Sequence, residues 1–173
     1  MRKLWIVLPL VLLLMGCGEK PTMETVTDLP AEPVVSTVRR VQIQLPKELS
    51  APTLQEESAG QLYICDDYSV TLQTVSSGDL QKTIRDATGM AQDTLQIQKN
   101  QQGDTKRYQF VWSTNGETGT QVGRCCILDD GTYHYVLTAL ADEGVAGDLQ
   151  PVWREMFTSF CLATEREPVN SGS

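Results

Sequence analysis

The sequence is poor in the residue type that catalysis and metal binding use most often, because it holds a single histidine, His134. A zinc site would have to combine this histidine with scattered cysteines that lack the paired spacing of zinc ligands. A serine hydrolase would need His134 as its base, and the Gly-x-Ser-x-Gly turn that presents the serine is absent. We therefore expect no catalytic residue, no bound metal and no cofactor, and we assign His134 to a surface or hydrogen-bonded position in a sheet.

The sequence also lacks a Cys-x-x-Cys redox motif. Cys65 is followed by two aspartates, whose negative charge disfavours a reactive thiolate. Cys125 and Cys126 are adjacent in a predicted strand, so they point to opposite faces, and a bond between them would strain the backbone. Together with Cys161 they are either disulfide partners in an exported chain or free thiols that pack as small hydrophobes.

Two aspartate pairs invite a calcium or glycosidase interpretation. Asp66-Asp67 and Asp129-Asp130 both fall at predicted hairpin turns, where aspartate accepts hydrogen bonds from its own backbone. The Asp-x-Asp-x-Asp-Gly calcium loop is absent, and no glycine-rich phosphate loop precedes a predicted helix. We interpret both pairs as structural turn residues.

Positive charge is scarce, since 14 lysines and arginines stand against 22 aspartates and glutamates and the net charge is −8. An acidic chain gains no affinity from phosphate backbones or anionic headgroups. The composition therefore disfavours nucleic acid as a partner, and contact with a membrane would need another source of affinity.

The N-terminus supplies such a source. Residues 1–3 carry positive charge, residues 4–15 form an apolar run, and Gly16-Cys17 follows. This layout is typical of a secretory signal, and the run is shorter than the roughly 20 residues that span a bilayer. Residues 14–17, Leu-Met-Gly-Cys, resemble the bacterial lipobox, which implies cleavage before Cys17 and a diacylglyceryl group on its sulfur. An ordinary signal peptide with an incidental cysteine is the alternative.

Cleavage at this point would remove the signal peptide 1–16, and the mature chain would hold 12 basic and 22 acidic residues, a formal charge of −10. Several acyl chains, at about 0.8 kcal/mol per buried methylene, would give lasting attachment through Cys17. The expected location is the cell membrane, with the lipid-anchored domain facing the extracytoplasmic side.

Composition divides the rest of the chain into three parts. Residues 17–37 hold the lipidated cysteine and a proline-rich, acidic stretch without apolar periodicity, which predicts a disordered tether of at most about 70 Å. Residues 164–173 are polar and predict a disordered tail. Residues 38–163 are sufficient for a single α+β domain with one core.

Alternation and turn residues predict an antiparallel sheet within that domain. Residues 38–45, 62–65 and 68–74 are typical of strands, and residues 46–60 are predicted as a loop. Gly103, together with the pairs Asn-Gly and Asp-Gly further on, marks three hairpin turns. These turns predict a four-stranded meander over residues 94–99, 106–114, 117–128 and 132–141.

Two-residue turns at Asn115-Gly116 and Asp130-Gly131 set a register that divides the meander into two apolar faces. One face carries Tyr108, Phe110, Trp112, Cys125, Ile127, Val136 and Leu140. The other carries Val111, Val122, Cys126, Leu128, Tyr133, Tyr135 and Leu137. Because both faces are apolar, both need cover from other elements.

Two helices are predicted to provide this cover. The first spans residues 80–87, after helix-start residues at 76–79 and before Gly89 as a C-terminal stop. The second follows Asp148 as a cap and holds Pro151 in its first turn. Its apolar residues recur at helical spacing: Leu149, Val152, Trp153, Met156, Phe157, Phe160 and Cys161. Burial of these side chains at roughly 1.5–3 kcal/mol each makes this helix a main clamp on the sheet.

One surface hypothesis follows from the register. Two-residue turns place Tyr108 and Trp112 on a strand opposite Gly119 and Gly123. Large rings opposite glycines indicate either core packing, in which the ring covers the glycine, or a shallow docking groove for a partner.

The order of these elements resembles the PsbP-like family, which includes the PsbP subunit of the photosynthetic oxygen-evolving complex and the bacterial lipoprotein DcrB. The matching residues are the aromatic strand 133–139 (Tyr-His-Tyr-Val-Leu-Thr-Ala) and the ending from Trp153 to Phe160. The resemblance implies an α/β/α sandwich of the α+β class, in which helices flank both faces of an antiparallel sheet of about six to seven strands. It also implies a non-enzymatic module that docks onto or supports other proteins.

We therefore predict a lipid-anchored extracytoplasmic lipoprotein that acts as a protein-binding or assembly module, with an envelope protein as its partner. Two alternatives stay open. One is an envelope thiol-redox protein or enzyme that uses Cys65 with Cys125 or Cys126, and the other is a lipoprotein that binds a small ligand between sheet and helix.

Overall fold

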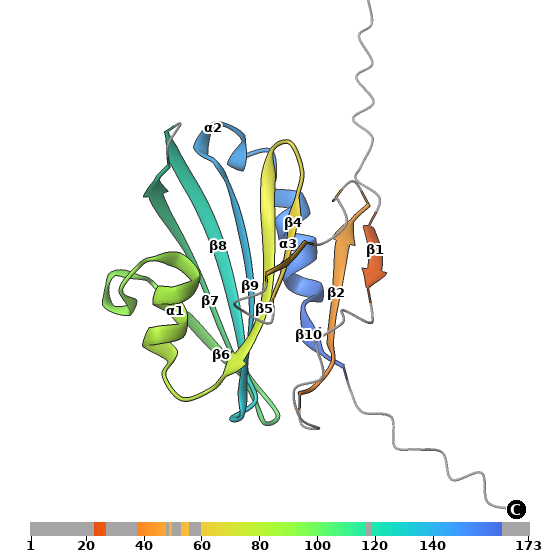
Figure 1. Cartoon of the computed structure of the whole chain (residues 1–173), viewed down its shortest axis with the longest axis vertical. Helices are drawn as coiled ribbons and strands as arrows, with labels where there is room; N and C mark the ends of the chain where they lie inside the picture. Colours follow the sequence, from red (N-terminus) through yellow and green to blue (C-terminus); the bar gives the residue numbers. More distant parts are fainter. Residues whose placement is uncertain are drawn as a thin grey trace, which may run out of the picture.

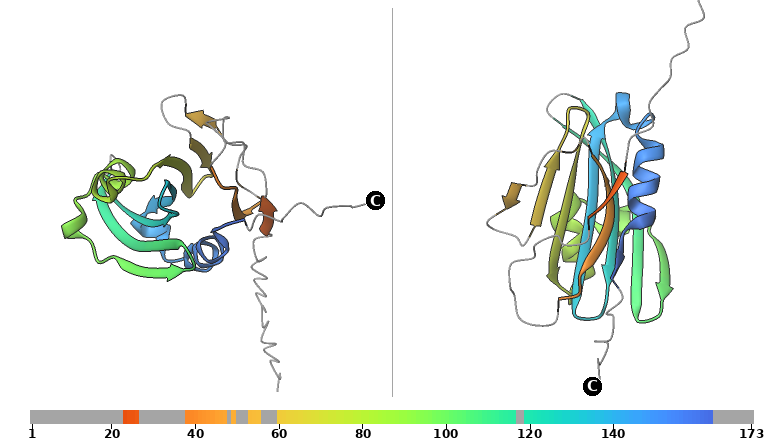
Figure 2. Two further views of the ribbon diagram at one scale, coloured as in Figure 1. Left: turned by 90° about the horizontal axis from the view of Figure 1, so that it is seen from below. Right: turned by 90° about the vertical axis from the view of Figure 1, so that its right-hand side faces the viewer.

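The computed structural model describes residues 23–26, 38–47, 49, 53–55, 60–116 and 119–163. The predicted signal peptide, the lipid-bearing Cys17 and the predicted tail lie outside these residues. The described part forms an antiparallel sheet with a helix packed on each face and a small second sheet beside one of the helices (Figure 1). Seen from below, the main sheet curls strongly (Figure 2). This is the predicted α+β arrangement.

The main sheet has seven strands, and neighbouring strands run antiparallel. The predicted hairpin over 62–74 and the predicted four-stranded meander are both confirmed. A short edge strand lies in the stretch 46–60 that was predicted as a loop. The sequence did not indicate it, because three residues are too few to show a period. Across the sheet the order is β3 (Thr53–Gln55), β4 (Gly60–Ile64), β5 (Tyr68–Ser76), β9 (Tyr133–Asp142), β8 (Thr120–Asp129), β7 (Thr105–Asn115) and β6 (Gln98–Gln102).

The register of the meander differs from the prediction by an even number of residues. Residues 116–119 join β7 to β8, so the turn is longer than two residues, and Trp112 pairs with Gly123 rather than with Gly119. The β8–β9 hairpin also has a longer loop, which moves its pairing by two residues. An even shift keeps every side chain on its own face. The predicted division into two faces therefore holds although the predicted turns are wrong.

The first helix, α1 (Leu80–Thr88), confirms the prediction at both ends. Asp79 is its N-cap, and the carboxylate accepts a hydrogen bond from the Lys82 N–H at 3.0 Å. Gly89 ends the helix with a φ of 72°, which glycine adopts without strain at Cβ. Ile84 of α1 packs on the first predicted face, whose buried members are Tyr108, Phe110, Trp112, Cys125, Ile127 and Val136.

The last helix, α3 (Gln150–Ser159), covers the opposite face. It begins without a side-chain cap, because Leu149 rather than Asp148 occupies the N-cap position. The N–H groups of both residues still donate to the Val145 carbonyl of the preceding turn, α2 (Glu143–Ala146). The predicted stripe is buried at Trp153, Met156, Phe157 and Phe160, and it packs against Cys126, Leu128, Tyr135 and Leu137 of the second predicted face.

A second sheet of three strands lies beside α3 (Figure 1). Its central strand β2 (Val41–Pro46) pairs with β1 (Met23–Val26) and with β10 (Cys161–Leu162). The tether predicted over 17–37 is thus not free of regular structure. The sequence of β1, Met-Glu-Thr-Val, alternates over too few residues to show a pattern, and only the free edge of β2 gives it a partner.

Two smaller differences concern the connections. A single 3-10 turn at Gln92–Thr94 occupies the start of the predicted strand 94–99, and Leu95 and Ile97 then pack beside α1. The strand β6 therefore begins later than predicted. Over the described residues, none of the helices combines the length and the apolar composition that crossing a membrane requires.

Candidate functional site

Tyr108 and Trp112, which were candidates for a docking surface, are part of the core. Their side chains are 8% and 7% exposed and lie in the cluster beneath α1. Trp112 pairs with Gly123, where a Cβ atom would overlap Cζ2, Cε2 and Cη2 of the indole. The glycine therefore makes room for a core ring, and the docking hypothesis for these two residues is wrong.

The four described cysteines all have free thiols. Cys125 lies beneath α1 and Cys126 beneath α3, so the two point to opposite faces as predicted. Burial raises the pKa of the Cys125 thiol well above its ordinary value and raises the pKa of the Cys126 thiol to about 11. Cys161 is exposed, and Cys65 donates to the Tyr68 carbonyl at 3.3 Å. Burial thus keeps both thiols of the adjacent pair protonated and out of reach.

His134 is hydrogen-bonded within the sheet, under α1. Its side chain is 3% exposed, its Nδ1 lies 2.8 Å from Thr83 Oγ1, and its Nε2 lies 3.9 Å from Asp129 Oδ1. Burial lowers the pKa of His134, although the neighbouring aspartates act in the opposite direction. Because Thr83 is buried as well, the three side chains join α1 to the sheet and offer no access to a substrate. Within the described residues, no cluster of three or more His, Cys, Asp or Glu could hold a metal ion.

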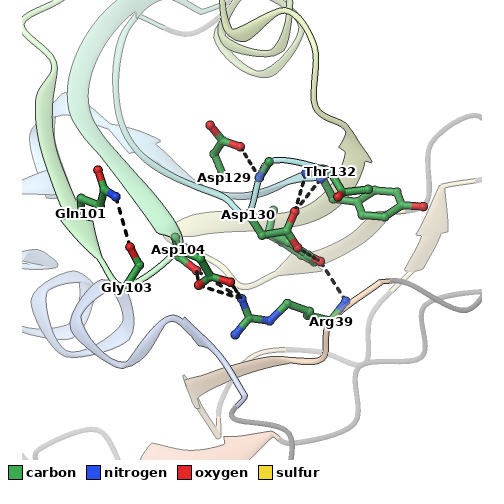
Figure 3. A network of polar contacts seen from close by, with 11 residues as sticks. Arg39, Gln101, Gly103, Asp104, Asp129, Asp130 and Thr132 are labelled. Atoms are coloured by element: carbon green, nitrogen blue, oxygen red, sulfur yellow. Dashed lines mark hydrogen bonds and ion pairs between the residues drawn. The ribbon is translucent and has the colours of Figure 1, made fainter.

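A second polar network ties the start of the domain to two hairpin turns (Figure 3). The Arg39 backbone N–H donates to the Tyr135 hydroxyl at 2.8 Å, and this hydroxyl donates to Asp130 Oδ2 at 2.8 Å. Asp130 Oδ1 accepts hydrogen bonds from the N–H groups two and three residues ahead. Burial would raise the pKa of Asp130, but these hydrogen bonds outweigh it and lower the pKa. Asp130 is therefore a structural turn residue, as predicted.

The surface that stays open lies on the same face as α3. Val111 of β7 is 64% exposed and pairs across the strands with Arg124 of β8. The Arg124 guanidinium lies over the Phe157 ring of α3, 4.7 Å from its centroid. Burial lowers the pKa of Arg124, and the nearby positive charge of Arg154 on α3 lowers it further. We name this region the Arg124 surface and define it by Val111, Ser113, Val122, Arg124 and Arg154.

Arg107 fixes the end of α3 next to this surface. Its guanidinium donates to the carbonyls of Phe157 and Phe160, the latter at 2.7 Å. With the Gln109 amide oxygen facing the guanidinium, that oxygen accepts from Arg107 Nε at 2.7 Å and from Nη2 at 2.9 Å. The last carbonyls of a helix have no partner within the helix. Arg107 therefore supplies the C-terminal cap that α3 lacks in its own sequence.

The arginines were missed by sequence reasoning, although a signal was present. The predicted register already assigned Cys126 to an inner face, and Arg124 lies two residues before it on the same face. Arg107 lies four residues before Val111 on β7 and therefore also points to the same face as Val111. An arginine on a face that is otherwise apolar indicates either a buried cap or a binding surface. Arg107 is a cap, and Arg124 lies beside the exposed Val111.

Two buried polar atoms have no hydrogen-bond partner in the described part of the chain. They are Gln61 Nε2 on β4 and the Trp153 Nε1 of α3. Both lie on the α3 side of the sheet, since Gln61 bonds the hydroxyl of Tyr63, which belongs to that cluster. Each unsatisfied group of this kind costs about 1–3 kcal/mol, so each invites a bound water or ligand atom.

The layers and the strand order define the class of protein, an α+β protein with the PsbP-like fold. Cyanobacterial PsbP from Synechocystis sp. PCC 6803 has a similar structure, with a TM-score of 0.58 and 8% identity over 86% of this chain and 96% of that chain. A point variant of the protein Mog1 is similar with a TM-score of 0.50 and 13% identity, over 83% of this chain and 97% of that chain. The Ran-binding protein Mog1p from Saccharomyces cerevisiae has a TM-score of 0.48 and 12% identity, over 83% and 96% of the two chains.

No family model matches the chain, and no curated protein is significantly similar to it in sequence. At identities of 8% and 13% the likeness is one of fold. The predicted PsbP-like fold is confirmed, and function has to be argued from the surface of this chain.

Proposed function

We propose that this chain is a lipid-anchored module that binds a protein partner on the extracytoplasmic side of the cell membrane and catalyses no reaction. The observation that carries the binding role is the Arg124 surface, where an exposed valine lies beside arginines on the sheet face that α3 packs against. The residues that chemistry would use, His134 and the adjacent cysteines, are buried in structural roles.

The support for the anchor comes from the sequence. Residues 1–17 have the charged start, the apolar run and the cysteine of a lipoprotein signal. Because β1 pairs with β2, five residues, 18–22, separate Cys17 from the first strand. Five residues extend at most about 18 Å. The domain would then lie against the membrane surface, and a membrane protein or another anchored protein is the partner within its reach.

A pull-down tests this proposal. The full chain would be crosslinked in its native host, purified from membranes and compared with a Cys17→Ala variant. We expect a specific envelope protein with the native chain and its loss with the variant. Recovery of the chain alone, at equal expression, would contradict a protein-binding role.

The thiol-redox alternative finds no support in the adjacent cysteine pair, whose thiols are buried and hold their protons. Labelling of the native protein with a thiol reagent separates the two ideas. We expect rapid reaction at Cys161 and reaction at Cys125 and Cys126 only after unfolding. A fast-reacting Cys125 or Cys126 in the folded protein would favour the redox role.

The small-ligand alternative has one observation in its favour, the unpartnered Gln61 Nε2 and Trp153 Nε1 atoms. A thermal-shift screen of small metabolites tests it, with a Gln61→Leu variant as the control. A ligand that raises the melting temperature of the native chain and not of the variant would support this role. If no compound does so, the buried atoms are structural features of the core.

A further inference from the structure

The Arg124 surface carries unmatched positive charge in a chain whose net charge is −8. Arg107 and Arg154 both lie close enough to Arg124 to lower its pKa. In the described part of the chain, none of these three arginines forms an ion pair with an aspartate or glutamate. Arg107 is occupied by carbonyl oxygens, which carry no full charge. Like charges that are held together without a counter-charge repel one another, so a carboxylate bound here would be stabilised.

The same surface offers an apolar anchor. Val111 pairs with Arg124 and is the most exposed of the large apolar side chains described, at 64%, ahead of Ile64 at 52%. Ser113 and Val122 pair with each other two residues further along the two strands; Ser113 is exposed and Val122 is half-buried. An apolar centre beside arginines, one of them stacked on an aromatic ring, is the composition that protein-binding surfaces favour.

Charge complementarity selects the occupant, because arginines without a counter-charge attract carboxylates. A second copy of this chain, with a net charge of −8, and an extended anionic lipid surface would both also be repelled by the rest of this acidic domain. The chain's own residues 164–173 contain two glutamates with an arginine between them, so they are only weakly acidic. A short segment of another protein with clustered aspartate or glutamate places its carboxylates next to the arginines, while salt screens the more distant charges of the domain.

We infer that the Arg124 surface docks an acidic segment of a partner protein, whose carboxylates pair with Arg124 and Arg154 and whose apolar side chain covers Val111. The inference rests on the proposed protein-binding function and adds to it the surface and the chemistry of the partner.

Site-specific photocrosslinking in the native host tests it. The full anchored chain would carry p-benzoylphenylalanine in place of Val111, and a matched chain would carry it in place of Ile64, an exposed position away from this surface. We expect a partner crosslink from position 111 and none from position 64. Mass spectrometry of the crosslinked peptide should find a segment with clustered aspartate or glutamate.

Charge variants give the second readout. Arg154→Gln should lower the crosslink yield from position 111 about threefold, and the double change with Arg124→Gln about tenfold, with a further loss at high salt. Arg85→Gln, on the exposed side of α1, should leave the yield unchanged. Arg154 is exposed, so its variant folds normally, and melting curves identify any loss of folding in the double variant.

The outcomes separate this inference from the proposed function. A crosslink from position 111 to lipid, to residues 164–173, to a second copy or to a segment without acidic residues would overturn the inference. A partner that is recovered in the pull-down but never crosslinks from position 111 would overturn it too, while the protein-binding function stands. Absence of any partner in the pull-down removes both.

Discussion

Trp112 and His134 show how single residues of this core depend on a neighbour far away in the sequence. The indole of Trp112 fills the space that a side chain at Gly123 would need. Burial lowers the pKa of His134, and its Nδ1 lies 2.8 Å from the hydroxyl oxygen of Thr83 on α1. At Gly123 the packing depends on the absence of a methyl group, and at His134 it depends on the imidazole ring. A single substitution at either site therefore has a predictable effect on stability.

Gly123→Ala should destabilise the protein. The new methyl group would overlap the Trp112 ring, which is confined between the sheet and α1, and overpacking of this kind costs about 1–3 kcal/mol. Chemical denaturation measures the free energy of unfolding. Gly144→Ala is the matched control, because a Cβ atom there meets nothing within 4 Å, and it should change stability by less than about 0.5 kcal/mol. Equal effects of the two changes would refute the close packing at Gly123.

His134→Asn should make the stability less sensitive to mild acid. Because burial lowers the pKa of His134 below its ordinary 6.5, both states are neutral above that pH. As the pH falls through about 6.5, the unfolded chain takes up a proton that the folded chain does not, and the free energy of unfolding decreases. Asparagine has no such proton and can still bond Thr83.

The measurement for His134 is the free energy of unfolding at several values between about pH 7 and pH 5. The native chain should lose stability over this range, and the variant should lose less of it, after an initial cost of about 1 kcal/mol at neutral pH. Asp130 does not confuse the comparison. Its lowered pKa removes stability only near and below the ordinary 3.8, because protonation then disfavours the folded state. Parallel curves for the two proteins would mean that His134 is not the titrating group.

At the scale of elements, the last helix depends on a residue outside itself. α3 starts without a side-chain cap, and its last carbonyls are satisfied by Arg107 from β7. The first helix has both signals in its own sequence, Asp79 and Gly89. The stability of α3 is therefore tied to the sheet in a way that the stability of α1 is not.

Arg107→Leu should lower the free energy of unfolding by about 2–3 kcal/mol, because two carbonyl oxygens lose a charged donor in a partly buried place. Arg107→Lys should recover only part of the loss. Lysine keeps the positive charge, but it lacks the planar group with which arginine reaches two acceptors. Denaturation of the two variants and of Arg85→Leu, an exposed control on α1, gives the comparison. A loss as small as that of the control would show that Arg107 does not cap α3.

At the scale of the whole molecule, the strand β1 changes how the domain is held. The sequence pattern predicted an unstructured tether from 17 to 37, but pairing of Met23–Val26 with β2 brings the start of the chain to within a few residues of the domain. If Cys17 carries lipid, the acidic domain is kept near the bilayer by its acyl chains and not by its charge.

The lipid attachment gives a prediction at this scale. Mass spectrometry of the full chain from its native membrane should find an N-terminal peptide that begins at Cys17 and carries the mass of a diacylglyceryl group. Cys17→Ser should keep residues 1–16 and carry no lipid, because the thiol is the acceptor. Cys161→Ser, an exposed cysteine in the domain, is the control and should be processed normally. An unmodified mature N-terminus at any other residue would mean an ordinary signal peptide.

The sequence by itself determined the class of fold, the faces of the meander and the first helix, because these follow from local periods and from caps a few residues away. Tyr108, Phe110 and Trp112 recur at every second position, and Asp79 and Gly89 bracket a helical run. The faces survived even where the turns were wrong, since the pairing shifted by four and by two residues and a period of two is unaffected by either.

Tertiary structure alone decided what meets across the layers. It placed Trp112 over Gly123 instead of at a docking groove, gave β1 and β3 their partners, and set Arg107 against the end of α3. It also left Val111 exposed beside a half-buried Arg124 on the face that α3 covers. The physical reason is the same in each case: a local pattern specifies which side chains point to a face, whereas the extent of the covering element and the register between strands depend on contacts between residues far apart in the chain.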